Sequence, residues 1–422
     1  MADCVMTNEN KNTLWTRDFT IITIGSVVSM LGNSLVGFAL SLMVLDYTSS
    51  SILYAIYMVT FTFPQLVTPI FSGALLDRFS RKKVIYTLDF ISAGIYMFMA
   101  VLLFTNKFSF VVFAIICFVL GIINSTYMVA YESLYPLLIT EGNYQKAYSI
   151  SSMLETMTAV MVPVSTFIYN MIGIAPLMVI NAFTFLIAAI VETQIKHQEE
   201  YVEKRSEEKE ENASNVKTML SDIKEGMLYL KSERGLLAIG LYFFFTMLSA
   251  GSENVLALPY YKQNFSNGEY LFILVMGMVF LGRAVGGGIH YKIKLPAKHK
   301  YMIAMCIYII VNIADGTFMF WPIPVAMGVC LVNGLCGVTS YTIRISSTQA
   351  YVPDDKKGRF NGAFLILVTS GMLVGELLAG ALGEVMDPRF VQLTLCGINL
   401  LMAFVLIGGN HKEVAKIYNT DN

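Results

Sequence analysis

Long apolar runs separated by short polar turns repeat along this chain of 422 residues. Two neighbouring runs read AIYMVTFTFPQLVTPIFSGALL and VIYTLDFISAGIYMFMAVLLF. About 20 apolar residues are enough for a helix to cross the hydrocarbon core of a bilayer. The runs lack the strict alternation of barrel strands, and lipid offers no partner for exposed backbone groups. Each run is therefore predicted to be a membrane-spanning helix.

The pattern predicts twelve spans in two groups of six. They cover residues 18–46, 51–76, 84–104, 109–131, 147–172, 174–194, 235–260, 268–292, 300–320, 323–350, 359–385 and 389–409. The chain is thus expected to be an all-α membrane protein with two six-helix bundles, at 1–194 and 235–409. A linker at 195–234 would join the bundles, and a tail would follow at 410–422.

The linker at 195–234 has two parts of different character. The first, KHQEEYVEKRSEEKEENASNVK, is charged and poor in apolar residues, which is typical of a solvated segment. The second, VKTMLSDIKEGMLYLKSERG, places apolar residues at helical spacing. We predict an amphipathic helix on the membrane surface there, with an exposed helical linker as the alternative.

Composition and charge support this assignment. Hydrophobic residues make up 55% of the chain and charged residues only 14%, well below the proportion of charge in soluble proteins. Of the 29 Lys and Arg, only Lys107, Lys262 and Arg389 fall in the loops that would lie outside if the N-terminus is cytoplasmic. The positive-inside rule therefore predicts a multi-pass protein of the cell membrane with both termini in the cytoplasm. Trp15 and Trp321 fall at predicted interfaces, as in an aromatic belt.

The turn GALLDRFSRKKVIY, residues 73–86, carries more than a topological anchor needs. Basic residues alone would suffice for orientation, yet the turn also has Asp77 and, four residues earlier, Gly73. Glycine allows another helix to approach closely, and a carboxylate can meet the positive N-terminal end of a neighbouring helix. The turn is predicted to be a latch that forms in one conformation and opens in another.

The pattern G-x-L-x-D-R-x-x-R-K closely resembles the signature of the major facilitator superfamily between helices two and three. Twelve spans in two sixes, joined by a charged linker, resemble that family too. The resemblance implies the major facilitator fold and transport by alternating access. It also implies a latch that closes the cytoplasmic side against the start of helix eleven. The residues that would form it are Gly73, Asp77, Arg78 and Arg81, with Arg359 as candidate partner.

Two further stretches resemble the branch of macrolide-efflux and enterobactin-exporter type permeases. They are RDFTIITIGSVVSMLGNSLVGFALSLMVLDYTSS and SSTQAYVPDDKKGRFNGAF. Where that branch usually has an acidic residue in helix one, this chain has Asn33. Related drug/proton antiporters often carry an Arg in helix four, which this sequence lacks, and of their helix-five motif only Pro163 is kept. The direction and the coupling ion therefore stay open at this point.

Ionisable side chains within spans are costly and mark candidate functional sites. The clearest are Asp89, Glu155, Glu253, Arg283, Asp315, Arg344 and Glu376. Carboxyl groups in a low-dielectric cavity can exchange protons, and the candidates for proton coupling are Glu155, Glu253, Asp315 and Glu376. An ion pair with Arg283 or Arg344 is the structural alternative. Glu132, Glu192 and Glu384 lie near predicted helix ends, where contact with water is expected.

In the family that the sequence resembles, helices one, four, seven and ten line the central cavity. The resemblance makes candidate cavity residues of Asn33, Asn124, Tyr127, Phe245, Glu253, Asn333, Tyr341 and Arg344. An aromatic wall with few polar groups suits an amphiphilic guest. The alternative for the aromatic run Tyr242–Phe245 is lipid contact or packing between helices. Gly371, Gly375 and Gly380 have the spacing of close helix packing.

These observations predict a secondary transporter that exports amphiphilic small molecules, with protons as coupling ion. Export of an endogenous metal chelator or polar metabolite is the main alternative, followed by uptake or lipid flipping. A membrane enzyme is disfavoured because the four His and six Cys show no metal-ligand spacing. We expect the lipid bilayer and a small-molecule substrate as partners, a monomer, no nucleic acid, no metal and no cofactor.

Overall fold

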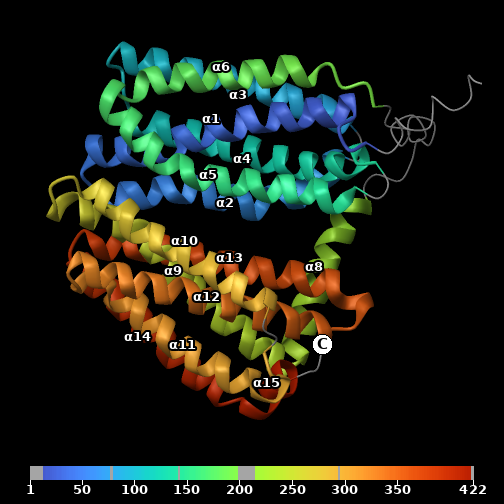
Figure 1. Cartoon of the computed structure of the whole chain (residues 1–422), viewed down its shortest axis with the longest axis vertical. Helices are drawn as coiled ribbons and strands as arrows, with labels where there is room; N and C mark the ends of the chain where they lie inside the picture. The colour runs from blue at the N-terminus through green and yellow to red at the C-terminus, as the bar shows by residue number, and fades with distance from the viewer. Residues whose placement is uncertain (1–12, 77–78, 141–142, 198–213, 293–294, 420–422) are drawn as a thin grey trace, which may run out of the picture. The chain divides into compact units, whose positions relative to one another are not determined.

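The structure is a computed structural model that describes residues 13–76, 79–140, 143–197, 214–292 and 295–419 (Figure 1). Within these ranges it contains 14 α-helices, joined by turns and short 3-10 segments. Each of the twelve predicted spans corresponds to one α-helix, which confirms the all-helical class. The chain divides into two compact units, of which the first holds residues up to Tyr47 and Phe63–Val216. The second holds residues 48–62 and those from Lys217 onward.

The first half of the chain supplies six helices. In chain order they are α1 (Arg17–Thr48), α2 (Ser51–Leu76), α3 (Arg81–Phe104), α4 (Phe110–Leu134), α5 (Tyr144–Ile172) and α6 (Ile174–Glu192). In the first unit α3 packs along α6 and also against α4 (Figure 1). Helices α5 and α6 meet at Gly173, whose φ of 78° favours glycine because a Cβ would be strained there.

The second half begins with α8 (Ser214–Ser232) and ends with a short helix after the last predicted span. The spans are α9 (Arg234–Asn264), α10 (Gly268–Lys292), α11 (Lys300–Thr317), α12 (Ile323–Tyr351), α13 (Lys357–Gly383) and α14 (Pro388–Met402), which continues as a π-helical segment. Helix α9 packs against α13 and α14, and α10 packs against α12. The tail contains α15 (His411–Tyr418), whose Tyr418 is completely buried.

Eleven helices of the described chain are long and apolar enough to cross a membrane. Helix α5 contributes the shorter apolar segment Met161–Ile172. Large apolar side chains on several of these helices are exposed, among them Phe104, Val111 and Met171. A soluble protein rarely exposes so many large apolar side chains, so these faces are suited to lipid.

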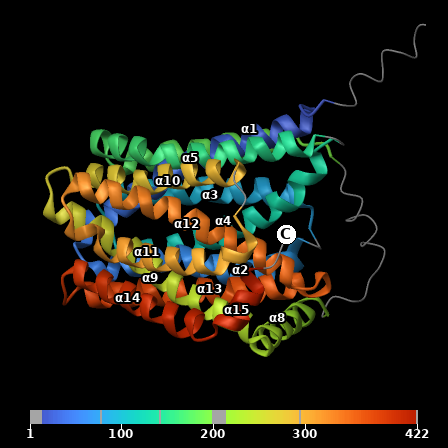
Figure 2. The same cartoon turned by 60° about the horizontal axis from the view of Figure 1, so that its bottom comes forward.

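The predicted amphipathic helix is present as α8, and its apolar side is partly packed within the second unit. Leu230 is buried in the same core cluster as Tyr308, Phe360 and Tyr418. Gly226 lies against the backbone of Arg359, and Figures 1 and 2 both place α8 beside the start of α13. Met227 and Leu228 remain exposed. The segment is thus a docked helix, and its contact with the membrane surface stays a prediction.

The two tryptophans lie in different units. Trp15 precedes α1, is 57% exposed and packs edge-on against Phe19, with 5.5 Å between the ring centroids. Trp321 lies between α11 and α12, is 49% exposed and donates from Nε1 to Oγ1 of Thr317 at 3.4 Å. Both stand at the ends of predicted spans, as expected for residues of an interface.

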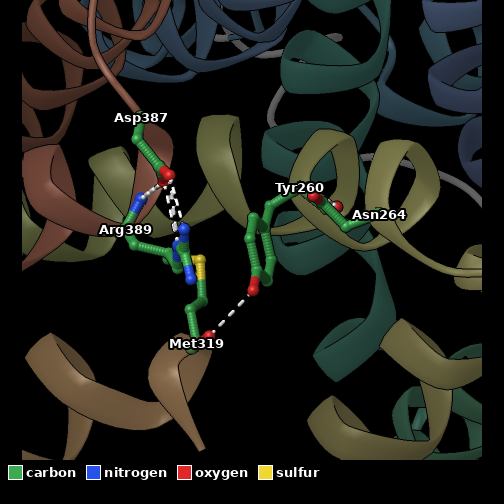
Figure 3. A network of polar contacts seen from close by, with 5 residues as sticks. All are labelled: Tyr260, Asn264, Met319, Asp387 and Arg389. Atoms are coloured by element: carbon green, nitrogen blue, oxygen red, sulfur yellow. Dashed lines mark hydrogen bonds and ion pairs between the residues drawn. The ribbon is translucent and has the colours of Figure 1, made fainter.

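A polar network joins three segments of the second unit (Figure 3). Asp387 caps α14 by accepting from the backbone N–H of Arg389 at 2.9 Å, and it also pairs with the Arg389 guanidinium at 2.7 Å. The guanidinium lies over the ring of Tyr260, whose hydroxyl donates to the carbonyl of Met319. The network therefore links the start of α14 to α9 and to the end of α11.

Replacing Asp387 by alanine should destabilise the second unit by about 1 kcal/mol, because it removes the helix cap. The pairing with Arg389 holds the pKa of Asp387 below its ordinary value. The charge therefore stabilises the folded state above a pH of about 4, and this contribution is lost as the pH falls through the folded-state pKa. Thermal unfolding of Asp387→Ala between pH 7 and pH 3 tests this expectation. Asp387→Asn, which keeps an acceptor for the cap, should retain most of the stability; an alanine variant that melts like the wild type would contradict it.

Candidate functional site

Two of the candidate cavity residues meet in the first unit. The side-chain amide of Asn33, on α1, donates to Oδ1 of Asn124, on α4, at 3.4 Å. The hydroxyl of Tyr96, on α3, donates to Oδ1 of Asn33 at 3.0 Å. Asn33 therefore joins three helices in a neutral network, at the position where the related branch has an acidic residue.

Tyr127, also predicted as a cavity residue, borders a cavity of about 370 Å³ in the first unit. Its walls are largely apolar and aromatic, and they carry a few polar groups. The lining includes Ser26, Met30, Tyr127, Tyr131, Glu132, Tyr135 and Leu154. The cavity is of the size and character of a small-molecule site.

The burial of Glu192 differs from the sequence prediction. Although it is the last residue of α6, its side chain is 0% exposed, whereas Glu132 and Glu384 are exposed as expected. It lies against Asp89 of α3, which is 1% exposed, and near the hydroxyl of Tyr127, 3.5 Å from its Oε1. Gly25 of α1 covers it so closely that a Cβ there would lie 2.6 Å from Oε1. The prediction of a solvent-exposed helix end is therefore wrong for Glu192.

In the second unit, four helices bring charged and polar side chains together. Asn333, on α12, donates through its amide to Oδ1 of Asp315 on α11. Glu253, on α9, interacts electrostatically with Asp315, and Arg283 of α10 acts on both carboxyl groups. Three candidates that are far apart in the sequence, Glu253, Asp315 and Asn333, therefore belong to one cluster. We call Glu253, Arg283, Asp315 and Asn333 the polar cluster of the second unit.

Arg344 is surrounded by aromatic rings. Its guanidinium carbon lies 4.8 Å from the ring centroid of Phe364, 5.3 Å from that of Phe243 and 5.2 Å from that of Tyr341. Within the described residues its Nε has no hydrogen-bond partner. The rings stabilise the cation by cation–π contact and leave hydrogen-bond donors available for an anionic group.

The residues of the aromatic run Tyr242–Phe245 of α9 differ in burial. Tyr242 and Phe243 are buried and pack against Tyr308, so the packing alternative holds for these two. Phe245 is only half-buried and packs edge-on against Phe244. Of the run, Phe245 remains the candidate for contact with a substrate.

Glu376 takes part in a different contact, between α13 and the first half of α2, both within the second unit. It is 1% exposed and accepts at Oε1 from the hydroxyl of Thr62 at 3.0 Å. Just after the end of α13, at the start of α2, Glu384 accepts from the backbone N–H of Ile52 at 3.0 Å and from the Ser50 hydroxyl. These bonds hold the pKa of Glu384 below its ordinary range. Two glutamates thus fasten α13 to α2.

The latch candidates are only partly described. Asp77 and Arg78 lie outside the described residues, and so do the surroundings of Gly73 and the side chain of Glu155. Arg81 donates to the carbonyl of Ser133 at 3.0 Å. Arg359, at the start of α13, pairs with Glu225 of α8 at 2.8 Å. The contact between Asp77 and Arg359 therefore stays a prediction.

The described residues hold no group of three or more His, Cys, Asp or Glu that could bind a metal ion. Four of the five described cysteines are buried, and all five are free thiols. The described chain supplies apolar helices with polar groups among them, which is typical of a polytopic membrane protein.

Comparison with known proteins agrees with this class. The family model described as Major Facilitator Superfamily matches residues 22–376. The chain therefore belongs to the major facilitator superfamily of secondary transporters. Two crystal structures of the nucleoside transporter NupG share the fold, with TM-scores of 0.64 and 0.66, over 92% of this chain. At 15% and 14% identity, they inform the fold alone.

Two curated relatives are similar in sequence. The uncharacterized MFS-type transporter YkuC of Bacillus subtilis is 23% identical over 329 residues, which cover 75% of each chain. Macrolide efflux protein A of Streptococcus pyogenes is 22% identical over 275 residues, covering 65% of this chain and 66% of that protein. The likeness to a macrolide-efflux protein agrees with the branch resemblance noted in the sequence.

Proposed function

We propose that this transporter exports amphiphilic small molecules by alternating access, in exchange for protons. The observation that carries the proposal is the polar cluster of the second unit. Two carboxyl groups and one guanidinium from three membrane-spanning helices act on one another there; Glu253 and Asp315 are half-buried and Arg283 is exposed. An ionised carboxyl group within a membrane span is costly. Protonation of a carboxyl group changes the free-energy cost of burying it. If that cost differs between two conformations of the helix bundle, protonation shifts the equilibrium between them.

The related macrolide-efflux protein supports an amphiphilic guest, and so does the largely apolar cavity beside Tyr127. The candidate guest-binding residues are Asn33, Asn124, Tyr127 and Phe245, together with Glu253, Asn333, Tyr341 and Arg344. We propose a monomer in the cell membrane with both termini in the cytoplasm, as the distribution of Lys and Arg indicates.

Transport in proteoliposomes with an imposed pH gradient tests this function. A fluorescent lipophilic cation and a labelled macrolide serve as probes, and a carboxylate-rich chelator serves as competitor. Gradient-driven movement of either probe, abolished when the gradient is collapsed, is the expected result. If neither probe moves under any gradient, drug-type export is wrong.

A second candidate function, export of an anionic metal chelator or polar metabolite, is favoured by Arg344. Its ring-bound guanidinium with a free Nε suits a carboxylate of the substrate. Specific binding of the chelator without movement of the cation would favour this function. Replacing Arg344 by lysine, which keeps the charge but removes the planar fork, should then weaken chelator binding by about tenfold.

Replacing Asp77 by asparagine should slow turnover by about tenfold while leaving probe binding unchanged, because the latch carboxylate would stabilise one conformation of the cycle. Glu413→Gln is the control, since Glu413 is an exposed carboxylate on α15, on the cytoplasmic side by the proposed topology and outside the latch segments. Rates of probe efflux and equilibrium binding are measured in parallel for both variants. Normal turnover in Asp77→Asn would contradict the latch.

A further inference from the structure

Asp89 of α3 and Glu192 of α6 form a carboxyl pair inside the first unit, and no candidate role considered above includes both. The two side chains are 1% and 0% exposed, and their carboxyl groups lie close enough to interact directly. Two carboxylate oxygens both accept, so a hydrogen bond between them requires that one of them carries a proton. A proton shared between the two carboxyl groups would join α3 to α6 at this point.

The surroundings of the pair supply no positive charge to replace that proton. From α4, Tyr127 faces Glu192, and Tyr131 lies within electrostatic range of it. From α1, Ser26 contacts the hydroxyl of Tyr127, and Gly25 covers Glu192. Among the described residues that act on the pair, none is basic. Two negative charges in contact in such an interior would repel each other strongly, so the pair stays protonated on one group unless a cation approaches.

Two buried oxygens of the pair receive no hydrogen bond from another group of the described chain. Oδ2 of Asp89 and Oε2 of Glu192 are buried and have no hydrogen-bond partner within the described chain. A buried oxygen without a partner is unfavourable, and a native structure normally satisfies such an atom. A proton on either carboxyl group would reduce the free-energy cost of burying these two oxygens without water.

Tyr127 connects the pair to the cavity of the first unit. Its hydroxyl lies 3.5 Å from Oε1 of Glu192 and 3.4 Å from Oγ of Ser26. The same side chain lines the 370 Å³ cavity, together with Tyr131, Tyr135 and the carboxylate of Glu132. Tyrosine rings and a carboxylate suit a lipophilic cation. A guest in the cavity would thus touch a residue that itself touches the carboxyl pair.

We propose that Asp89 and Glu192 form a proton-binding site of the first unit, and that Tyr127 links its occupancy to a lipophilic cation bound in the cavity. A cation beside Tyr127 favours the ionised pair, so the shared proton leaves as the guest binds; in the absence of guest the proton returns. Only the identity of the guest rests on the proposed function. Tyr127 is a positioning residue in this scheme.

The proton site can be tested without transport, by infrared difference spectroscopy of the full-length protein in lipid nanodiscs. The wild type should show the C=O absorption of a protonated carboxyl group at a pH where exposed carboxyl groups are ionised. Asp89→Asn and Glu192→Gln should each remove or shift that absorption, and Glu413→Gln, at an exposed position on α15, should leave it unchanged. Two nearly isosteric variants keep the test decisive if one of them does not fold. An absorption unchanged in both overturns the site.

The link to the guest is measured as proton release into weakly buffered solution when tetraphenylphosphonium binds. The wild type should release a proton on binding, and Glu192→Gln should release at least fivefold less. Tyr127→Phe should retain the carboxyl absorption but release less, which a merely structural role would not produce. If the absorption is present but the cation neither binds nor moves, the proton site stands and export of cations fails. If the cation is transported and the absorption is absent, the export function stands and the proton site fails.

Discussion

A Glu253→Gln variant should fold normally but lose gradient-driven efflux by about tenfold or more, the size of a strong coupling between two sites. Glu253 and Asp315 are half-buried in the second unit and interact electrostatically, and Arg283 acts on both. The amide cannot exchange a proton, so the pH gradient can no longer bias the conformations through this group. Asp315→Asn should have a similar effect, because it also leaves one carboxyl group alone with Arg283.

Efflux at an imposed pH gradient is compared with counterflow of labelled against unlabelled probe at equal pH. Counterflow should persist in Glu253→Gln, because substrate exchange alone does not require the proton. Glu269→Gln is the control: it makes the same change from carboxylate to amide, but in the first turn of α10 and outside the polar cluster. Full gradient-driven efflux in both Glu253→Gln and Asp315→Asn would refute a coupling role for the polar cluster.

Replacing Gly375 by valine should lower the stability of the second unit by about 3 kcal/mol, the upper range for overpacking a closed contact. A Cβ at Gly375 would lie 2.0 Å from the backbone oxygen of Leu248 on α9. One turn earlier, a Cβ at Gly371 would lie 2.2 Å from the backbone oxygen of Phe244. Backbone atoms cannot rotate away, so α9 and α13 would have to separate along this contact.

The expected fall in melting temperature is about 10 °C for a unit of this size. Gly362→Val is the matched control on the same helix, because nothing lies within 4 Å of a Cβ built there. Thermal unfolding and gel filtration of both variants in the same detergent give the comparison. Equal melting temperatures would show that the α9–α13 contact tolerates side chains.

The hydrophobic pattern was sufficient to predict the helices, because the length of each apolar run is set by the bilayer and not by distant contacts. The glycines of α13 were predicted as packing positions, and Gly371 and Gly375 do contact α9. Gly380 meets Ala55 of α2 instead. The spacing of glycines along one helix predicts a face without side chains, where another helix can pack closely. It does not identify which helix packs there.

The site was less predictable, since it depends on which helices become neighbours. Glu192 ends an apolar run and precedes the polar stretch TQIKHQEEY, so the sequence around it is that of an exposed helix end. Its burial results from Gly25 of α1 and Asp89 of α3, which lie more than a hundred residues away in the chain. One hint in the sequence was Asp89 itself, a carboxyl group within a span that would need a partner.

The partners of Arg344 also could not be predicted from the sequence. The sequence identified a cation within a span, for which a carboxylate was the natural partner. The structure provides instead the rings of Phe243 and Phe364, from α9 and α13. Aromatic residues are so frequent in this chain, at 13%, that no sequence pattern distinguishes these two from those that face lipid.

The placement of the two tryptophans has a practical consequence. Because Trp15 stands at the start of α1 and Trp321 at the start of α12, each compact unit contains one tryptophan. Under excitation selective for tryptophan, Trp15→Phe and Trp321→Phe would each leave a single emitting residue without any added label. The wavelength and quenching of that emission would then follow the surroundings of one unit at a time, so that the response of each half to pH or guest can be recorded separately.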